Sequence, residues 1–336
     1  MTLTVLPGFG ADGRPDPQVA RRAAEAWLAG GLVGLPTETV YGLAADAEHP
    51  GAVARVFRAK GRPADHPLIV HVAGVAALPG WTAGDPGAAL QLAQACWPGP
   101  LTVIVRRGAR ASDLITGGQG TVALRCPAHP VARACLAALV EASGDPGRGV
   151  AAPSANRFGR VSPTSALDVV AELADRLDPG RDLVIDGGRS AVGVESTIVD
   201  CTGPQARVLR LGAISQTEVD AVLGVAASAR TVRGVGAGAV VARGASTAGP
   251  SSGAASAGGA VPPGAVRAGP VRAPGTLDSH YAPRARVVLV EAADAVAALP
   301  GLASIARVPG LLAPASVPTP AGWTRLAAPA GSEQYA

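Results

Sequence analysis

Up to residue 223 the chain alternates short apolar runs with segments whose apolar residues recur at helical spacing. Seven runs have the length of strands, at residues 32–36, 68–72, 101–105, 121–125, 183–186, 196–200 and 207–211. Helical patterns fill the gaps, at 51–59, 86–96, 130–142, 164–177 and 216–223. This alternation predicts an α/β domain rather than an all-helical or all-β one.

The best-marked helix begins at Pro17, since Asp16 can cap its N-terminus and proline fits a first turn. Gly30 and Gly31 predict its end. The last helix, at 216–223, opens with a capping-box pattern from Ser215 to Glu218.

The composition changes after residue 223. Residues 224–275 use only glycine, alanine, valine, serine, threonine, proline and arginine, a set that cannot build a hydrophobic core. We therefore expect three parts: a catalytic domain at 1–223, a low-complexity linker at 224–283 and a C-terminal α/β piece at 284–336. Within the last part, residues 286–299 predict one strand followed by one helix.

Composition also limits the class of protein. Hydrophobic residues make up 48% of the chain and aromatic residues 3%, but no run approaches the roughly 20 apolar residues of a membrane span. No export signal is evident at the N-terminus, so we expect a cytoplasmic protein. The four cysteines contain no Cys-x-x-Cys pair, which predicts reduced thiols and no zinc site.

The net charge of +4 does not indicate a nucleic-acid-binding domain. Residues 1–223 hold 20 basic and 21 acidic side chains, and the excess of basic residues lies beyond them. Of the 29 cationic side chains, 28 are arginine, and the single lysine is Lys60.

Candidate chemistry gathers near the ends of predicted strands, where open α/β sheets bind their ligands. Lys60 and Arg62, on a loop stiffened by glycine and proline, suit a phosphate. Arg125 ends a strand and suits a carboxylate. Hydroxyl and amide donors are frequent in residues 35–42, 152–166 and 193–200. Each cluster alone is also compatible with an ordinary structural role: a strand-to-helix turn capped by threonine at 35–42, a solvated basic turn at 60–71, and a snorkelling side chain at Arg125. No P-loop, Ser-His-Asp order or metal-ligand spacing accompanies them, so residue types alone predict a site for a nucleotide and a small zwitterion.

Six strings occur together and in order: PTETVYGL, KGRP, PLIVH, WPGPLTVI, APSAN and VESTIVD. With them, residues 17–223 resemble the threonylcarbamoyl-AMP synthase family, the YrdC-like proteins. The segment APGTLDSHYAP at 273–283 resembles the interdomain segment of the family's long, two-domain form. The resemblance implies a twisted mixed sheet with flanking helices, a large concave cavity and a small C-terminal α/β domain. Only 53 residues follow Pro283, so we expect that second domain to be incomplete.

The resemblance also implies an activity, in which L-threonine, bicarbonate and ATP give L-threonylcarbamoyl-AMP and pyrophosphate. Magnesium would be carried on the phosphates, with no protein ligand. A downstream tRNA threonylcarbamoyl-transferase would use the product to modify an adenosine beside the anticodon.

The resemblance assigns residues to three roles. Lys60 and Arg62 would be catalytic. Threonine would be bound by Thr39, His71, Arg125, Ser154 and Ser196. ATP would be bound by Lys60, Arg62, His66, Thr121, Ala152, Asn156, Ser162, Arg210 and, from the interdomain segment that would act as a lid, Tyr281.

Two other interpretations compete with the synthase. An RNA-binding module of the same fold would make at least weak RNA contact, but residues 1–223 have no net positive charge and no aromatic platform for bases. A carbamoyl-transfer domain of a hydrogenase-maturation protein shares the fold, but it should carry zinc-finger cysteine pairs and an acylphosphatase segment, which this sequence does not show.

Overall fold

The computed structural model describes residues 2–225, 272–273, 310–311 and 324–325. The chain divides into two units, Met1–Tyr281 and Ala282–Ala336. In the second unit, β11 (Gly310–Leu311) pairs in parallel with β12 (Thr324–Arg325). Most of the predicted linker, the predicted strand and helix at 286–299, and Tyr281 lie outside the described residues.

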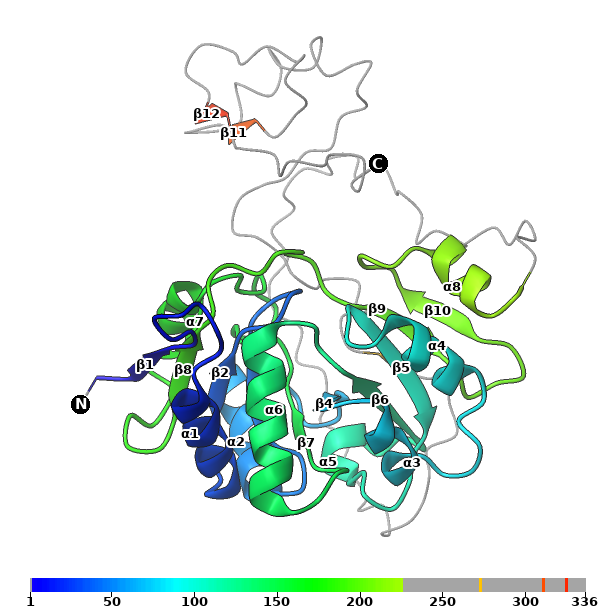
Figure 1. Ribbon diagram of the computed structural model, residues 1–336, viewed down its shortest axis with the longest axis horizontal. Helices are drawn as coiled ribbons and strands as arrows, with labels where there is room; N and C mark the ends of the chain where they lie inside the picture. Colours follow the sequence, from blue (N-terminus) through cyan, green and yellow to red (C-terminus); the bar gives the residue numbers. More distant parts are fainter. Residues whose placement is uncertain (1, 226–271, 274–309, 312–323, 326–336) are drawn as a thin grey trace, which may run out of the picture. The chain divides into compact units, whose positions relative to one another are not determined.

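The first unit is built on a ten-stranded mixed sheet in the order β1-β8-β2-β3-β7-β4-β6-β5-β9-β10 (Figure 1). The sheet contains both parallel pairs, such as β4 with β6, and antiparallel pairs, such as β5 with β6. The strands are β1 (Thr4–Pro7), β2 (Val33–Leu35), β3 (Gly42–Asp46), β4 (Ile69–Val72), β5 (Leu101–Arg106), β6 (Thr121–Arg125), β7 (Gly149–Ala151), β8 (Leu183–Asp186), β9 (Thr197–Asp200) and β10 (Arg207–Arg210). The mixed α/β fold expected from the sequence is confirmed.

Helices cover both faces of the half of the sheet that contains β1, β8, β2 and β3. Successive strand residues point to opposite faces. Ala44 accordingly packs with α1 (Pro17–Leu28) and α6 (Pro130–Ser143), whereas Leu43 and Ala45 pack with α2 (Pro50–Lys60) and α7 (Ala166–Leu173). All five residues of β3 are buried for this reason.

The other half of the sheet has a helical layer on one face. Leu101, Val103 and Val105 of β5 turn toward the core that includes 3-10 helix η1 (Val75–Ala77), α3 (Leu78–Trp81), α4 (Ala88–Cys96) and α5 (Asp113–Thr116). Thr102 and Ile104 therefore point to the opposite face. Ile104 packs there with Ile69 and Ala123 in a small cluster to which no helix of the described residues contributes.

The sequence-predicted helices and strands of the first unit are present, with shifts of a few residues at their ends. Asp16 accepts a hydrogen bond from Gln18 N at 2.8 Å, and Ser215 and Glu218 form the capping box of α8 (Gln216–Val222). Strands β1, β3 and β7 were not predicted. The segment after residue 35 enters strand β3 rather than a helix, which corrects the alternative of a strand-to-helix turn.

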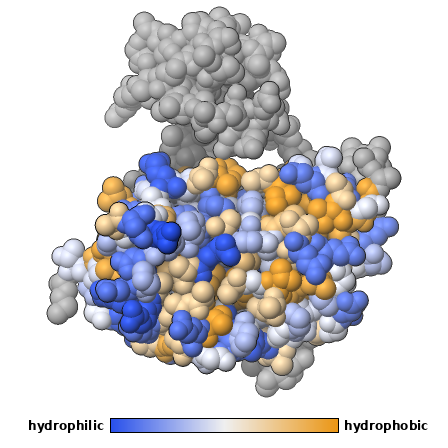
Figure 2. All heavy atoms as spheres, viewed as in Figure 1, coloured by the Kyte–Doolittle hydropathy of each residue, from blue (hydrophilic) through white to orange (hydrophobic). Residues whose placement is uncertain are grey.

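On the face shown in Figure 2, hydrophobic residues gather over α4 and α8 among more polar ones. Leu90, Cys96, Val222 and Leu223 are partly buried there against the core. No helix among the described residues is both long and apolar enough to cross a membrane.

Candidate active site

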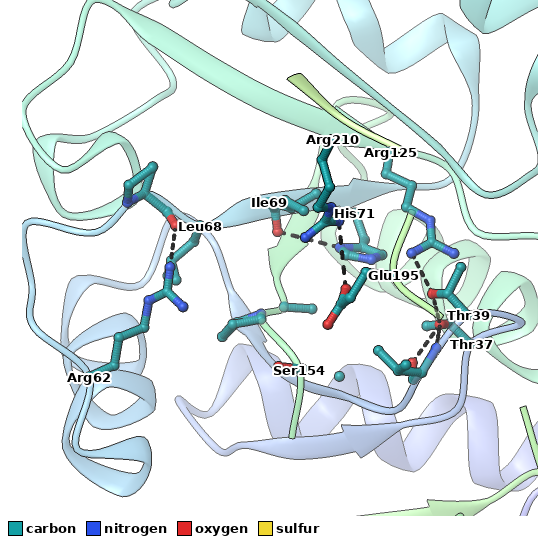
Figure 3. A pocket seen from close by; sticks show the side chains of 15 residues that line it. Thr37, Thr39, Arg62, Leu68, Ile69, His71, Arg125, Ser154, Glu195 and Arg210 are labelled. Carbon is teal, nitrogen blue, oxygen red and sulfur yellow. Dashed lines mark hydrogen bonds and ion pairs between the residues drawn. The ribbon is translucent and has the colours of Figure 1, made fainter. Parts of the chain in front are cut away.

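A pocket lies on the face of the sheet that carries Thr102 and Ile104, and several of the predicted clusters meet there (Figure 3). It encloses about 480 Å³ of empty space, its open mouth included. Its walls are formed by Thr37, Thr39, Val40, Gly42, Arg62, Pro67, Leu68, Ile69, His71, Arg125, Ala152, Pro153, Ser154, Glu195 and Arg210. Three arginines and one carboxylate thus face one small space.

Arg125 is held at the end of β6 by two buried partners. One terminal nitrogen donates to Thr39 Oγ1 at 2.7 Å, and the other forms an ion pair with Glu38 Oε1 at 2.6 Å. The Arg125 side chain is only 3% exposed. Its Nε and the second oxygen of Glu38 have no hydrogen-bond partner among the described residues. The Nε donor of Arg125 is thus buried and unpaired among the described residues.

His71 lies beside Arg125 because the two residues are in register on the parallel strands β4 and β6. Burial, together with the Arg125 charge, lowers the pKa of His71 to about 3. The imidazole is therefore neutral near pH 7, and it can exchange hydrogen bonds with a ligand without adding a fourth positive charge.

Glu195 projects into the middle of the pocket in Figure 3, between Arg210 and the threonine side chains. Its Oε1 accepts a hydrogen bond from Ser162 at 2.9 Å, and its Oε2 lies 3.7 Å from Arg210 Nη2. A Cβ added at Gly212 would lie 2.3 Å from the Glu195 carbonyl oxygen, so glycine permits the close approach of these two segments.

Ser196 is fully buried at the back of this group. Its hydroxyl exchanges a hydrogen bond with Thr102 at 2.7 Å and accepts one from Arg210 Nη2 at 3.1 Å. Arg210 Nε also donates to the Ser196 carbonyl at 3.0 Å. Ser196 thus positions the Arg210 guanidinium through two hydrogen bonds.

Arg62 approaches the pocket from the side away from Arg125, after α2 ends (Figure 3). Gly61 adopts the left-handed conformation, with φ of 63°, and turns the chain toward the sheet. Arg62 Nη2 donates to the Pro67 carbonyl at 2.9 Å, and the guanidinium lies 5.9 Å from the centre of the Phe158 ring.

Lys60, predicted to bind ATP phosphates, is not among the residues that line the pocket. Its ammonium donates to the carbonyl oxygens of Ser154 and, at 2.5 Å, Asn156. Burial, reinforced by the Arg62 charge, lowers the pKa of Lys60 to about 7. The predicted contact with ATP is untested, and these hydrogen bonds favour a role for the ammonium in holding the backbone at Ser154 and Asn156.

The remaining predicted residues surround the pocket at different depths. Ala152 and Ser154 line it, whereas Ser162 reaches it through Glu195. His66 packs edge-on against Phe158, with ring centres 5.3 Å apart. Asn156 is buried and donates to the carbonyls of residues 157 and 160, and Thr121 lies at the start of β6. Tyr281 lies outside the described residues.

Two groups at the site had no assigned role in the sequence analysis. Glu195 lies in the string VESTIVD, where an acid followed by two hydroxyl residues was the available signal. Glu38 follows Thr37 in PTETVYGL, but its ion pair joins residues 87 positions apart, which no local pattern predicts.

Residues 272–273 contact the same face of the sheet. Gln119 brackets the backbone of Arg272, accepting from its N–H at 2.7 Å and donating to its carbonyl at 3.2 Å. Ala273 is buried against Ile69 and Ile104. This short stretch therefore packs on the first unit beside the pocket.

The geometry defines an α/β protein with an arginine-lined pocket on the face of its sheet that no helix of the described residues covers. The family model Sua5_yciO_yrdC, described as "Telomere recombination", matches residues 25–212. A second model, described as "Threonylcarbamoyl-AMP synthase, C-terminal domain", matches residues 229–316. The chain belongs to the Sua5/YciO/YrdC family.

Curated relatives carry a more specific name. The chain is 38% identical over 262 residues to the threonylcarbamoyl-AMP synthase of Pyrococcus abyssi, covering 78% of this chain and 65% of that protein. It is 42% identical over 210 residues to the enzyme of the same name from Bacillus subtilis, covering 62% of this chain and 57% of the relative. The chain thus spans less than two thirds of the length of both relatives.

Solved structures agree on the fold. Pyrococcus abyssi Sua5 complexed with L-threonine matches with a TM-score of 0.59 and 41% identity, covering 66% of this chain and 61% of that one. Escherichia coli YciO matches with a TM-score of 0.51 and 22% identity, covering 64% of this chain and 98% of the other. The second likeness concerns the fold alone.

Proposed function

We propose that this chain is an L-threonylcarbamoyladenylate synthase, a nucleotidyltransferase that joins L-threonine, bicarbonate and ATP with release of pyrophosphate. The observation that carries the proposal is the pocket itself, where Arg62, Arg125 and Arg210 face a single carboxylate, Glu195. This combination of charges suits the threonine carboxylate, bicarbonate and the ATP phosphates, which are anionic, together with the threonine ammonium. The names of the relatives and the threonine complex of Pyrococcus Sua5 support the same conclusion.

Threonine would lie between Arg125 and Glu195. The guanidinium of Arg125 and the hydroxyls of Thr39 and Ser154 would bind its carboxylate. Glu195 is the one acidic side chain among the described residues of the pocket wall, so it would accept the α-ammonium. Neutral His71 would complete the contacts. Ser196 would act from behind, through Arg210.

ATP would occupy the side of the pocket toward Arg62 and Arg210. Arginine presents a planar fork of donors that matches phosphate oxygens. Magnesium would accompany the phosphates without a protein ligand. Glu195, the one carboxylate of the described pocket wall, is already engaged by Ser162 and faces Arg210, and Mg²⁺ keeps most of its water. His66, Thr121, Ala152, Asn156 and Tyr281 remain proposed nucleotide contacts.

The chemistry would proceed in two steps. The threonine ammonium loses a proton, and its amine combines with bicarbonate to give a carbamate and water. A carbamate oxygen then attacks the α-phosphorus of ATP, and the bond to the β-phosphate oxygen breaks to release pyrophosphate. The residues of the pocket position the reactants and stabilise charge, because in-line displacement at phosphorus needs no covalent help from side chains.

The product is a reactive mixed anhydride that a second enzyme must consume. We propose a tRNA threonylcarbamoyl-transferase as that partner, in the cytoplasm, with weak direct RNA contact by this chain. Filter binding without ATP tests the RNA contact.

Pyrophosphate release from ATP tests the activity. We expect release that depends on both L-threonine and bicarbonate, with Arg58→Met as a control because Arg58 is exposed and outside the pocket. Release that ignores either substrate would contradict the proposal.

A further inference from the structure

The single lysine of the chain is built into a connection between two loops. Lys60 ends α2, is 3% exposed, and donates from its ammonium to the carbonyl oxygens of Ser154 and Asn156. An ammonium is a compact charge with three donors, so it can serve two converging carbonyls at once. Without it, both carbonyls would lose a charged donor.

Further contacts join the same two loops. Phe158 N donates to the Lys60 carbonyl at 2.8 Å, and the Phe158 ring lies beneath Arg62 and against His66. Asn156 closes the turn from within, donating to the carbonyls of residues 157 and 160 at 2.8 and 2.7 Å. The C-terminal end of α2 and residues 154–160 therefore form one connected unit.

This unit borders both halves of the pocket. Ser154 lines the wall on the side proposed for threonine, and Arg62 lines the side proposed for phosphates. Burying a cation is costly, and here burial depresses the pKa of Lys60 to about 7. A buried group beside a pocket whose pKa is shifted by desolvation and a charged neighbour is a candidate for a functional role.

We propose that Lys60 is a positioning residue: it contacts neither substrate and couples the threonine and nucleotide subsites by fixing the Ser154–Asn156 backbone. The identity of the two subsites rests on the proposed function. The hydrogen bonds from Lys60 to the carbonyls of Ser154 and Asn156 do not depend on that function.

The first test measures the hold alone. In hydrogen–deuterium exchange, Lys60→Met should raise the exchange rate of the amides at residues 155–158 about tenfold, as expected for losing hydrogen bonds to a charged donor. The amides of β4 should be unchanged. Arg58→Met, which removes an exposed cation from the same helix, is the matched control. Unchanged exchange at 155–158 would overturn the proposal.

The second test measures the coupling by calorimetry. Lys60→Met should weaken both L-threonine and ATP binding about tenfold, and Ser154→Ala should cost less threonine affinity in that background than in the wild type. Loss of ATP affinity alone, additive with Ser154→Ala, would show a direct phosphate contact and overturn the proposal. If the wild type binds neither substrate, the proposed function fails, while the exchange result still decides what Lys60 holds.

A third test needs no variant, in case Lys60→Met does not fold. Because Lys60 is the only lysine, labelling with ¹⁵N-lysine gives one ammonium signal from the full chain. We expect it to be protected from solvent exchange without ligand and to show no coupling to phosphorus when ATP is added. Exchange as fast as that of free lysine would overturn the proposal.

Discussion

Replacing Arg125 by methionine should separate the binding role of this arginine from its structural role. The substitution leaves Glu38 as a buried carboxylate whose 2.6 Å ion-pair partner is gone. Removing one partner of a buried pair costs about 3 to 5 kcal/mol of unfolding free energy. Threonine binding should weaken by about 2 to 4 kcal/mol, the range for truncating one partner of a buried charge pair.

The double variant Arg125→Met/Glu38→Met distinguishes the two effects. Replacing both members of a buried ion pair by apolar side chains of similar size is often close to neutral for stability. We therefore expect urea unfolding of the double variant to recover most of the lost free energy. Threonine affinity should stay low, because the donor for the carboxylate is still absent, and ATP affinity should barely change.

Arg55→Met supplies a matched control outside the pocket. Arg55 forms a 2.5 Å ion pair with Asp182, which is fully buried. This variant should lose stability as Arg125→Met does but bind threonine normally in calorimetry. Recovery of threonine affinity by the Arg125/Glu38 double variant would refute the reasoning, since it would show that only the uncompensated charge on Glu38 had impaired the site.

Three further predictions concern the titration of Lys60 and His71 and the packing of residues 272–273. The folded pKa of Lys60, about 7, lies below its unfolded value, so the unfolded chain binds more protons above pH 7. In urea titrations, the unfolding free energy of the wild type should therefore rise from pH 7 to 9 by up to about 2 kcal/mol relative to that of Lys60→Met. The imidazole of His71 should stay neutral in NMR titrations down to about pH 4, and an inflection of its chemical shift near pH 6.5 would contradict this. The contribution of His71 to the unfolding free energy should decline as pH falls from about 6.5 toward 3, because only the unfolded chain takes up the proton in that range. Gln119→Ala should speed tryptic cleavage after Arg272, whose backbone Gln119 brackets, and equal rates in variant and wild type would show that the bracket does not hold this segment.

Elements with strong local signals could be predicted from the sequence. The cap at Asp16 and the β-branched run of β8 depend on neighbouring residues, and both elements are present. Strand β3 is different, because its residues, Gly42–Asp46, read GLAAD and carry no β-branched side chain. It becomes a strand because β2 and β7 pair with it on either side and helices bury both of its faces.

The candidate site was predictable in part for a similar reason. Strand alternation alone places His71 and Arg125 on one face, once their strands are known. The direction of the Lys60 ammonium could not be predicted, because its acceptors are backbone carbonyls more than 90 residues away. Every residue has a backbone carbonyl, so the residue type does not show which carbonyl will accept the hydrogen bond.

Product analysis with ¹³C-labelled bicarbonate tests the central proposal most directly. The full chain is incubated with ATP, magnesium, L-threonine and the label, and the products are separated and weighed by mass spectrometry. We predict an adduct of threonine and AMP that carries the labelled carbon, together with pyrophosphate, and no adduct when threonine is omitted. An adduct without the label, or AMP and pyrophosphate with no adduct, would contradict the assignment of this pocket to threonylcarbamoyl-AMP synthesis.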